Sequence, residues 1–194
     1  MGAETELAVS YGRTWRDEDA FDLIGSDLLT AGVILKSKLG IDDMTPRQIV
    51  DYLIARVVAG LQGEITWRPG AVELIRSLAD ESVPQALVTM SWHEIADPFG
   101  KLLPFDTVVS GDQLERGKPH PDPYLLAAER LGVDPADCLA VEDSPTGAAS
   151  ASAAGCRVLT VPHIISIPPG PRRLTVPTLA GVTPTALRTL TFDR

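Results

Sequence analysis

Two adjacent carboxylates, Glu142 and Asp143, are the first candidates for chemistry in this sequence. They directly follow a short apolar run, Leu139–Val141, and precede a Ser-Pro-x-Gly turn and an alanine-rich stretch. Carboxylates at the carboxyl end of a buried parallel strand lie where open α/β sheets bind their ligands. Their oxygens suit Mg²⁺, which often shares its ligands with a substrate phosphate. The alternative is a helix start, in which Asp143 or Ser144 is the N-cap and Glu142 is merely solvated.

A threonine and a lysine are the other groups suited to phosphate chemistry. Thr89 directly follows the apolar run Ala86–Val88, and its hydroxyl can donate to a phosphate oxygen together with nearby backbone N–H groups. Lys118 stands in the proline-rich segment Gly117–Tyr124, which is stiff enough to hold a cation in place. A lysine that neutralises phosphate needs such a platform, whereas a solvated lysine does not. Thr at a strand end is common without any function, so Thr89 alone predicts little.

The histidines and cysteines are expected to have structural or ordinary surface roles. His120 lies between two prolines and is expected to be structural, while His93 and His163 have no evident partner and are expected on the surface or in loops. Cys138 and Cys156 each begin an apolar run, and neither has a Cys or His neighbour at metal-ligand spacing. Both cysteines are therefore expected to pack as small hydrophobic side chains.

The elements that must position these groups fall into two halves. In residues 1–66 the apolar positions recur at helical spacing, as in Ile49, Leu53 and Val57, which predicts an all-helical domain. Residues 67–194 alternate short apolar runs with helical stretches, which predicts βαβ units and a parallel sheet covered on both faces. The expected order is helix 71–79, strand 86–88, strand 105–109, helix 123–131, strand 139–141, helix 148–154, strand 158–161 and a closing helix 184–190.

The charge balance narrows the range of partners. The chain has 17 basic and 26 acidic residues, a formal net charge of −9 and a pI of about 4.7. This balance disfavours nucleic acid and anionic membrane surfaces as partners. No apolar run approaches the roughly 18 residues that span a bilayer, and the acidic segment Met1–Glu6 lacks the basic and apolar regions of a signal peptide. A cytoplasmic protein is expected.

Thr89, Lys118 and the acid pair at 142–143, in this order on successive βα units, resemble the motifs of the haloacid dehalogenase (HAD) superfamily of phosphohydrolases. The likeness is nearest to its phosphoglycolate phosphatase and β-phosphoglucomutase-like branch. The resemblance implies an α/β fold with a HAD-like Rossmannoid parallel sheet. The sheet would form the core domain at residues 67–194, and residues 1–66 would form an α-helical cap.

The resemblance also implies a role for each matching residue. Thr89 would hydrogen-bond the transferring phosphoryl group, and Lys118 would hold that group and the nucleophile as negative charge builds up. Glu142 and Asp143 would hold Mg²⁺, directly or through water. The implied substrate is a small phosphorylated metabolite. Phosphoryl transfer depends mostly on positioning and on electrostatic stabilisation, which agrees with this set of groups.

One part of the family pattern is absent from this sequence. The resemblance implies a first strand ending in Asp-x-Asp-Gly-Thr, whose first Asp is the nucleophile and whose second Asp is the general acid and base. Asp17-Glu18-Asp19 follows no buried strand, and Asp42-Asp43 has adjacent rather than alternating acids, so both are expected to be helix-start acids. The chain is expected to begin after the nucleophile motif. It would then lack the central strand between those that end at Thr89 and Glu142.

Three functions follow from this pattern. The first is a Mg²⁺-dependent phosphatase whose nucleophilic Asp is absent from this chain, because of a late start or a fragment. The second is a catalytically inactive HAD-like binding or regulatory protein, in which the motif is truly lost. The third is a sugar-phosphate mutase, which is less favoured because Gly25-Ser26-Asp27-Leu28 has no Arg where mutases of this branch carry Gly-x-Ser-Arg.

Overall fold

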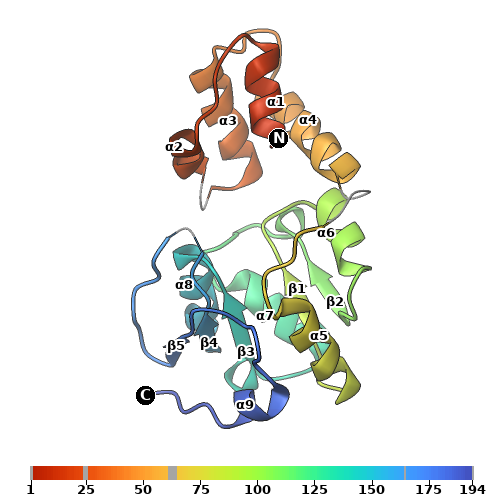
Figure 1. The fold of residues 1–194 in the computed structure, drawn as a ribbon, viewed down its shortest axis with the longest axis vertical. Coiled ribbons are helices and arrows are strands. Elements are labelled where there is room, and N and C mark those ends of the chain that lie inside the picture. The colour runs from red at the N-terminus through yellow and green to blue at the C-terminus, as the bar shows by residue number, and fades with distance from the viewer. Residues whose placement is uncertain (1, 24–25, 61–64, 164, 194) are drawn as a thin grey trace. The chain divides into compact units, whose positions relative to one another are not determined.

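The chain divides into two compact units, Met1–Ile65 and Thr66–Arg194 (Figure 1). The computed structural model describes residues 2–23, 26–60, 65–163 and 165–193. In the first unit every described regular element is a helix, as the helical spacing predicts. These elements are α1 (Ala3–Ser10), α2 (Asp17–Ala20), a short 3-10 helix (Phe21–Leu23), α3 (Leu28–Leu39) and α4 (Pro46–Gly60).

The helical unit has its own apolar core. Leu7 of α1, Leu35 of α3 and Ile49 of α4 are almost completely buried and belong to one cluster. Helix α4 begins with a reciprocal cap, because the Gln48 N–H donates to Thr45 Oγ1 (3.2 Å) and the Thr45 N–H donates to Gln48 Oε1 (2.8 Å). The unit therefore consists of helices packed on one apolar core, as the helical spacing predicts.

The acidic pairs of this unit lie near helix starts, away from any strand. Asp19 in α2 accepts a hydrogen bond from the Arg16 N–H (3.0 Å) and pairs with Lys38 (3.2 Å). Asp43 accepts a hydrogen bond from the Tyr11 hydroxyl (2.6 Å). The side chain of Asp17 lies outside the described residues. Asp19 thus caps the start of α2, whereas Asp43 binds Tyr11, 32 positions away in the chain.

The second unit alternates strands and helices. Its strands are β1 (Ala86–Val88), β2 (Thr107–Val109), β3 (Leu139–Glu142), β4 (Arg157–Thr160) and β5 (Arg173–Thr175). Its α-helices are α5 (Ala71–Asp80), α6 (His93–Gly100), α7 (Asp122–Leu131), α8 (Pro145–Ala153) and α9 (Pro184–Arg188). Short 3-10 helices lie at Gly111–Gln113 and Pro135–Asp137. The sequence pattern predicts most of these elements to within a few residues, but it does not predict α6 or β5.

The strands form two parallel sheets, where the alternation of elements predicts a single one. Strand β1 pairs with β2, and separately β3, β4 and β5 pair in that order. The break lies between the strands that precede Thr89 and Asp143, because no strand in the described segments pairs with the free edge of β1 or of β3. The predicted strand 105–109 is also shorter than expected, since its ladder with β1 begins only at Thr107.

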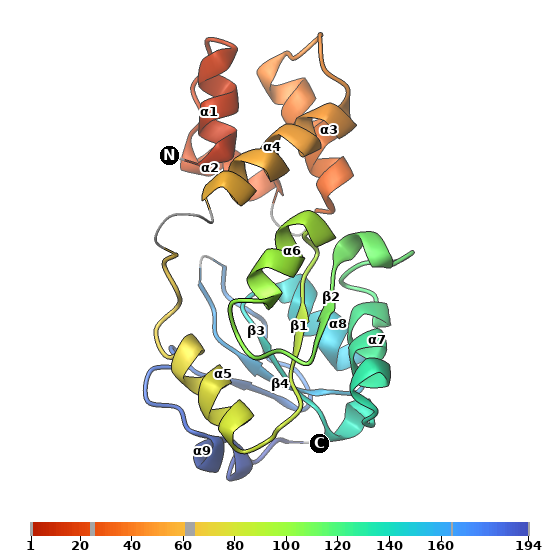
Figure 2. The ribbon, with the colours of Figure 1, turned by 90° about the vertical axis from the view of Figure 1, so that its right-hand side faces the viewer.

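Helices cover the strands on two sides, with α5 on one side and α7 and α8 on the other (Figure 2). Strand β3 connects the two layers, because its successive side chains point to opposite faces. Ala140 belongs to the cluster that includes Tyr124 of α7 and Ala148 of α8. Leu139 packs against the cluster that contains Leu74 of α5. Both faces of this strand are therefore apolar, as in a buried parallel sheet.

None of the helices found in the described segments combines the length and the apolar character needed to cross a bilayer.

The two cysteines differ in burial, which predicts a difference in reactivity. Cys156 is 3% exposed, and burial raises the pKa of its thiol to about 11, whereas Cys138 is only half-buried. The thiolate is the reactive form, so a thiol reagent at pH 8 should modify Cys138 slowly and Cys156 only after unfolding. Counting modified thiols with and without denaturant checks this, with Cys138→Ser as the control. Modification of both thiols in the folded chain would contradict it.

Candidate active site

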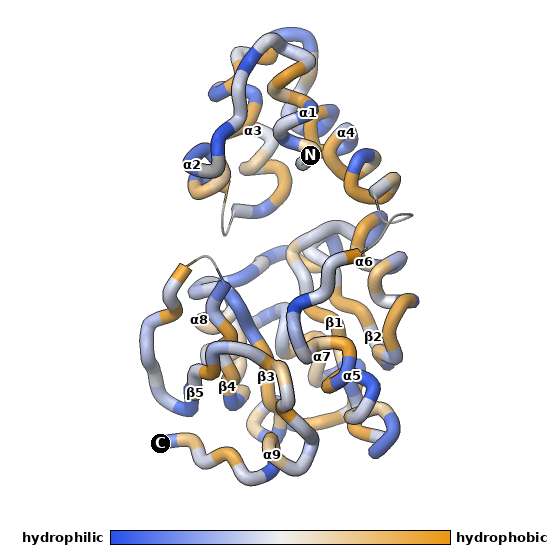
Figure 3. Tube along the Cα trace, in the orientation of Figure 1, coloured by the Kyte–Doolittle hydropathy of each residue, from blue (hydrophilic) through white to orange (hydrophobic). Residues whose placement is uncertain are grey.

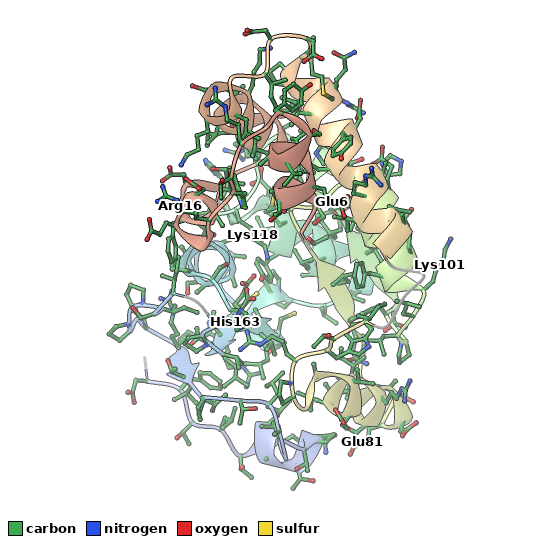
Figure 4. The ribbon with its side chains drawn as sticks, turned by 45° about the horizontal axis from the view of Figure 1, so that its top comes forward. Glu6, Arg16, Glu81, Lys101, Lys118 and His163 are labelled. Carbon is green, nitrogen blue, oxygen red and sulfur yellow. The ribbon has the colours of Figure 1, made fainter. Side chains whose placement is uncertain are left out.

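Lys118 and Glu142 meet at the carboxyl ends of β1 and β3. Lys118 is labelled in Figure 4. Its ammonium lies 2.5 Å from Glu142 Oε1 and donates to the carbonyl oxygen of Val88 at 3.2 Å. The two side chains are only 11% and 5% exposed. A buried carboxylate is stable when it has both a counter-charge and hydrogen bonds, and Glu142 has both. The structure thus joins two of the residues that the sequence singles out, 24 positions apart.

The start of α8 fixes the Glu142 carboxylate from the other side. The Ser144 hydroxyl is the N-cap of α8, accepting the Gly147 N–H at 3.1 Å, and it also lies 3.3 Å from Glu142 Oε2. Gly147 packs so closely against this carboxylate that a Cβ atom there would overlap it. Part of the helix-start alternative is therefore correct, because Ser144 is the cap. Its other part is wrong, because Glu142 is buried and paired rather than solvated.

Tyr124 of α7 completes the surroundings of Glu142, and the sequence assigned it no role. Its hydroxyl donates to Glu142 Oε1, and its ring centre lies 5.1 Å from the Lys118 ammonium. Burial, together with the negative charge of Glu142, raises the pKa of Tyr124 well above its ordinary value, so the hydroxyl keeps its proton and remains a donor. The signal that could have identified Tyr124 was its position at the end of the segment Gly117–Tyr124, where a helix begins.

The proline-rich segment holds Lys118 through its backbone. The Lys118 N–H donates to Met90 Sδ at 3.4 Å, and the Lys118–Pro119 peptide bond is cis. The His120 N–H donates to the carbonyl of Gly117 (2.9 Å), while its own carbonyl accepts the Ser150 hydroxyl of α8. These contacts attach the segment to the loop after β1 and to α8. His120 takes part in them through its backbone, in line with the structural role expected for it.

Asp143 points to a different partner from Glu142. Its side chain is 59% exposed, and its Oδ2 atom lies 3.7 Å from Arg68 Nη1. The Arg68 guanidinium also donates to the carbonyl oxygens of Val161 (2.9 Å) and Pro162 (3.1 Å), just after β4. Arg68 was not among the residues singled out by type and spacing, because its partners are more than 70 positions away in the chain.

Thr89 lies at the same edge of the strands but bonds only to its own loop and to β2. Its N–H donates to the Val109 carbonyl (2.9 Å), and its hydroxyl oxygen accepts the Ser91 N–H (3.1 Å). Within the described residues, Thr89 and Asp143 make no hydrogen bond or ion pair with Lys118 or Glu142. The structure thus brings all four groups to two strand ends, while only Lys118 and Glu142 are in direct contact.

A second cluster of possible ligands lies at the start of α6. His93 Nδ1 lies 2.6 Å from Asp112 Oδ2 and 3.3 Å from Glu94 Oε2, and these three residues form the metal-compatible group found within the described chain. The other oxygen of Asp112 accepts the His93 N–H (3.0 Å) and so caps α6. The hydrogen bond to Asp112 raises the pKa of His93. His93 is exposed, as expected, but no local pattern indicated its partner.

Comparison with known proteins identifies the family of this chain. A family model described as haloacid dehalogenase-like hydrolase matches residues 16–155, and the chain belongs to this family. The chain is 43% identical over 100 residues to hexitol phosphatase A of Escherichia coli, covering 50% of the chain and 46% of that protein. It is 32% identical over 167 residues to the bifunctional riboflavin kinase/FMN phosphatase of Arabidopsis thaliana, covering 79% of the chain and 41% of that protein. The chain thus spans less than half the length of these two relatives.

Solved structures share the fold over most of the chain. CbbY from Rhodobacter sphaeroides, solved in complex with phosphate, superposes with a TM-score of 0.82 at 24% identity, covering 96% of this chain and 90% of that one. A structure described as a β-phosphoglucomutase from Thermotoga maritima has a TM-score of 0.71 at 25% identity, covering 97% and 90% of the two chains. The chain therefore has the HAD-like fold, with one helical unit and one α/β unit.

Proposed function

We propose that this chain carries the phosphate-binding and metal-binding half of a Mg²⁺-dependent phosphatase that acts on a small phosphorylated metabolite. The observation that carries the proposal is the buried Lys118 ammonium held between the ends of β1 and β3. The names of its relatives support it, because they include hexitol and FMN phosphatases. In this proposal residues 1–66 are the cap that selects the substrate.

Lys118 and Thr89 retain donors for a phosphoryl group. An ammonium group has three N–H donors, and the described contacts of Lys118 use one on Val88 and one on Glu142. The third is free to bind a phosphoryl oxygen. The Thr89 hydroxyl accepts a hydrogen bond from Ser91, so its own O–H proton is available for another phosphoryl oxygen. Together they would stabilise negative charge as it spreads over the transferring group.

The acid pair fits a hard cation, with different parts for its two members. The carboxylate of Asp143 is exposed and faces Arg68 at 3.7 Å through Oδ2, so its other oxygen could ligate Mg²⁺ directly. Glu142 Oε1 is already engaged by Lys118 and Tyr124, so Glu142 would act on the ion through water and would mainly position Lys118. Bound Mg²⁺ would supply positive charge to neutralise the phosphoryl oxygens. Oxygen donors of this kind are those that Mg²⁺ prefers.

The nucleophile in this proposal is an aspartate from sequence outside these 194 residues. One of its carboxylate oxygens would attack phosphorus while the ester oxygen leaves, and water would then release phosphate. The contacts of Asp19 with Arg16 and of Asp43 with Tyr11 support this view, because both acids serve the helical unit. In the alternative, an inactive binding protein, Lys118 and Thr89 would still bind phosphate, but no aspartate would attack phosphorus.

The purified chain should therefore not hydrolyse p-nitrophenyl phosphate in the presence of Mg²⁺. Fusing a strand that ends in Asp-x-Asp-Gly-Thr ahead of Met1 should produce turnover, because it adds the missing nucleophile. Phosphate release measures both. Turnover by the chain alone that disappears with Asp17→Asn or Asp19→Asn would overturn the assignment. Phosphate binding without turnover, with or without the added strand, would favour the inactive binding protein.

Asp143→Asn should abolish Mg²⁺-dependent turnover of that fused enzyme and leave the fold intact. The neutral amide keeps the size of the side chain, and the exposed position makes a large loss of stability unexpected. Activity as a function of Mg²⁺ concentration checks the first part and thermal unfolding the second. Asp80→Asn, at the exposed end of α5 in the same unit, is the control. Unchanged turnover in Asp143→Asn would remove this residue from the metal site.

The mutase alternative has less support. Asp27, which stands near the position where mutases carry their cap Arg, is the N-cap of α3 and accepts both the N–H (3.0 Å) and the hydroxyl (2.6 Å) of Thr30. Its hydrogen bonds with Thr30 lower the pKa of Asp27, so this carboxylate is negatively charged at neutral pH. A carboxylate there repels a second phosphate. Gly25, the first residue of that stretch, lies outside the described residues.

A further inference from the structure

We infer that His93, Glu94 and Asp112 form a binding site for a divalent transition-metal ion, of which Zn²⁺ is the best match. Each of the three side chains offers one ligand atom, and these atoms all lie within 4.8 Å of one another. The ligand atoms are an imidazole nitrogen and two carboxylate oxygens. The site does not use the acid pair at 142–143, so the inference does not depend on the proposed phosphatase reaction. It can be tested without any turnover.

The parallel pairing of β1 and β2 brings the two segments of this site together. Both strands are coloured as largely hydrophobic in Figure 3, and their carboxyl ends lie at the same edge of the sheet. His93 and Glu94 begin α6, which follows β1, and Asp112 follows β2. The Gly111 N–H donates to the Ser91 carbonyl (2.9 Å), which ties the two segments to each other. The fold therefore holds the three ligands in place from both sides.

The Nδ1 atom of His93 lies between the two carboxylates. It is 2.6 Å from Asp112 Oδ2 and 3.3 Å from Glu94 Oε2. Two ligand atoms that each lie about 2.1 Å from a tetrahedral Zn²⁺ are about 3.4 Å apart. The pair with Glu94 already has this spacing, and the pair with Asp112 must open by about 0.8 Å. The His93 side chain is 55% exposed, so it has room for this movement and the ion can enter from solvent.

Glu94 supplies an oxygen that the described residues leave without a hydrogen bond. Its Oε2 atom is buried, although the side chain as a whole is 37% exposed. This atom lies near His93 Nδ1 but accepts no hydrogen bond from it or from another described residue. A carboxylate oxygen that is shielded from water and lacks a donor is destabilising. A metal ion bound beside Nδ1 would give this oxygen a partner.

The two oxygens of Asp112 have separate tasks. Its Oδ1 atom accepts the His93 N–H at 3.0 Å and caps α6, which leaves Oδ2 for the ion. The start of a helix has a positive potential, and the carboxylates of Asp112 and Glu94 offset it. Asp97, exposed on the same helix, adds to the negative potential at His93. A cation would therefore bind without loss of the helix cap.

The donor set selects the class of metal. One imidazole nitrogen and two carboxylate oxygens match the three protein ligands of an open Zn²⁺ site, in which water takes the fourth position. Imidazole suits zinc, copper and nickel, whereas Mg²⁺ prefers oxygen ligands alone. The site should therefore retain Zn²⁺ in the presence of Mg²⁺.

Calorimetric titration of the full 194-residue chain with Zn²⁺, in an excess of Mg²⁺, tests the inference. The Mg²⁺ fills sites made of oxygen alone, so the Zn²⁺ that binds reports a site that contains nitrogen. His93→Gln should weaken Zn²⁺ binding by at least about tenfold, because loss of a residue that merely supports a metal ligand already costs about 10- to 100-fold. Zn²⁺ should also slow amide hydrogen exchange by about tenfold at residues 93–96 and 111–113 together. Exchange at Arg173–Thr175 of β5 should not change.

Three further variants locate the ion. Asp112→Asn can still cap α6 but lacks the charged oxygen, so it should also weaken Zn²⁺ binding by at least about tenfold. Asp97→Asn removes the same charge nearby without removing a ligand, and should weaken binding by no more than about threefold. His163→Gln removes another exposed histidine and should change nothing. Equal losses in Asp97→Asn and Asp112→Asn would overturn the inference, because binding would then follow net charge alone. So would Zn²⁺ binding that is absent from the unaltered chain or that survives His93→Gln unchanged.

Discussion

We expect Lys118→Met to lower the free energy of unfolding of the chain by about 3–5 kcal/mol. The substitution leaves the Glu142 carboxylate, which is 5% exposed, without its counter-charge. The Tyr124 hydroxyl and the Ser144 hydroxyl remain beside it, but neither is charged. A buried ion that loses its partner is far less stable than a pair replaced as a whole. Urea unfolding followed by tryptophan fluorescence measures the change.

Two controls separate this effect from the loss of any lysine. Lys101→Met removes an exposed lysine of the same unit and should change the stability by no more than about 0.5 kcal/mol. Adding Glu142→Gln to Lys118→Met removes the stranded charge and should recover part of the loss. If Lys118→Met cost no more than Lys101→Met, the buried ion pair would not be a determinant of the fold.

The same substitution should reduce kcat of the enzyme fused to a nucleophile strand by about 100-fold or more. This is the size of the loss when one strong charge contact to the transition state disappears. Phosphate-ester hydrolysis at saturating substrate measures it. A loss confined to KM would mean that Lys118 binds substrate and transition state equally well, and would contradict its catalytic role.

The sequence predicted the strand ends of the site well, for a simple physical reason. Carboxyl ends of parallel strands meet at one edge, so groups that follow successive apolar runs converge there. This placed Lys118 and Glu142 together, and it predicted β1, β3 and β4 to within a residue. The strands are short and apolar on both faces, which makes their boundaries visible as changes of composition.

The contacts that the sequence did not predict are those between distant segments. In the sequence Tyr124 is an ordinary helix residue, and only the packing of α7 against β3 brings it to Glu142. Arg68 is likewise an ordinary loop residue, and only the fold brings it to the end of β4. Strand β5 was missed because Arg173-Leu174-Thr175 has a single apolar residue. Helix α6 was missed because it contains Pro98, which disfavours a helix in isolation. Tertiary packing overrides local preference at each of these places.

Gly147→Ala should destabilise the chain by at least about 2 kcal/mol, although alanine favours a helix interior over glycine by about 1 kcal/mol. The added methyl group overlaps the Glu142 carboxylate and must push it away from Lys118 and Tyr124. The overlap therefore outweighs the helix preference. A lower free energy of unfolding in Gly147→Ala would show the overlap, because the helix preference alone would raise it. The control is Ala149→Ser, which adds one atom at an exposed position of the same helix and should cost no more than about 0.5 kcal/mol.

A double-mutant cycle assigns the effect to Glu142 itself. Glu142→Ala alone should destabilise the chain, because it leaves the Lys118 ammonium buried without a counter-charge. Once that carboxylate is gone, Gly147→Ala has nothing to collide with, so the double variant should be no less stable than Glu142→Ala. The coupling free energy should then be about 2 kcal/mol or more, measured from four urea unfolding curves. Additive losses would mean that the alanine strains the start of α8 rather than the carboxylate, and the close packing of Gly147 on Glu142 would not be what holds the ion pair in place.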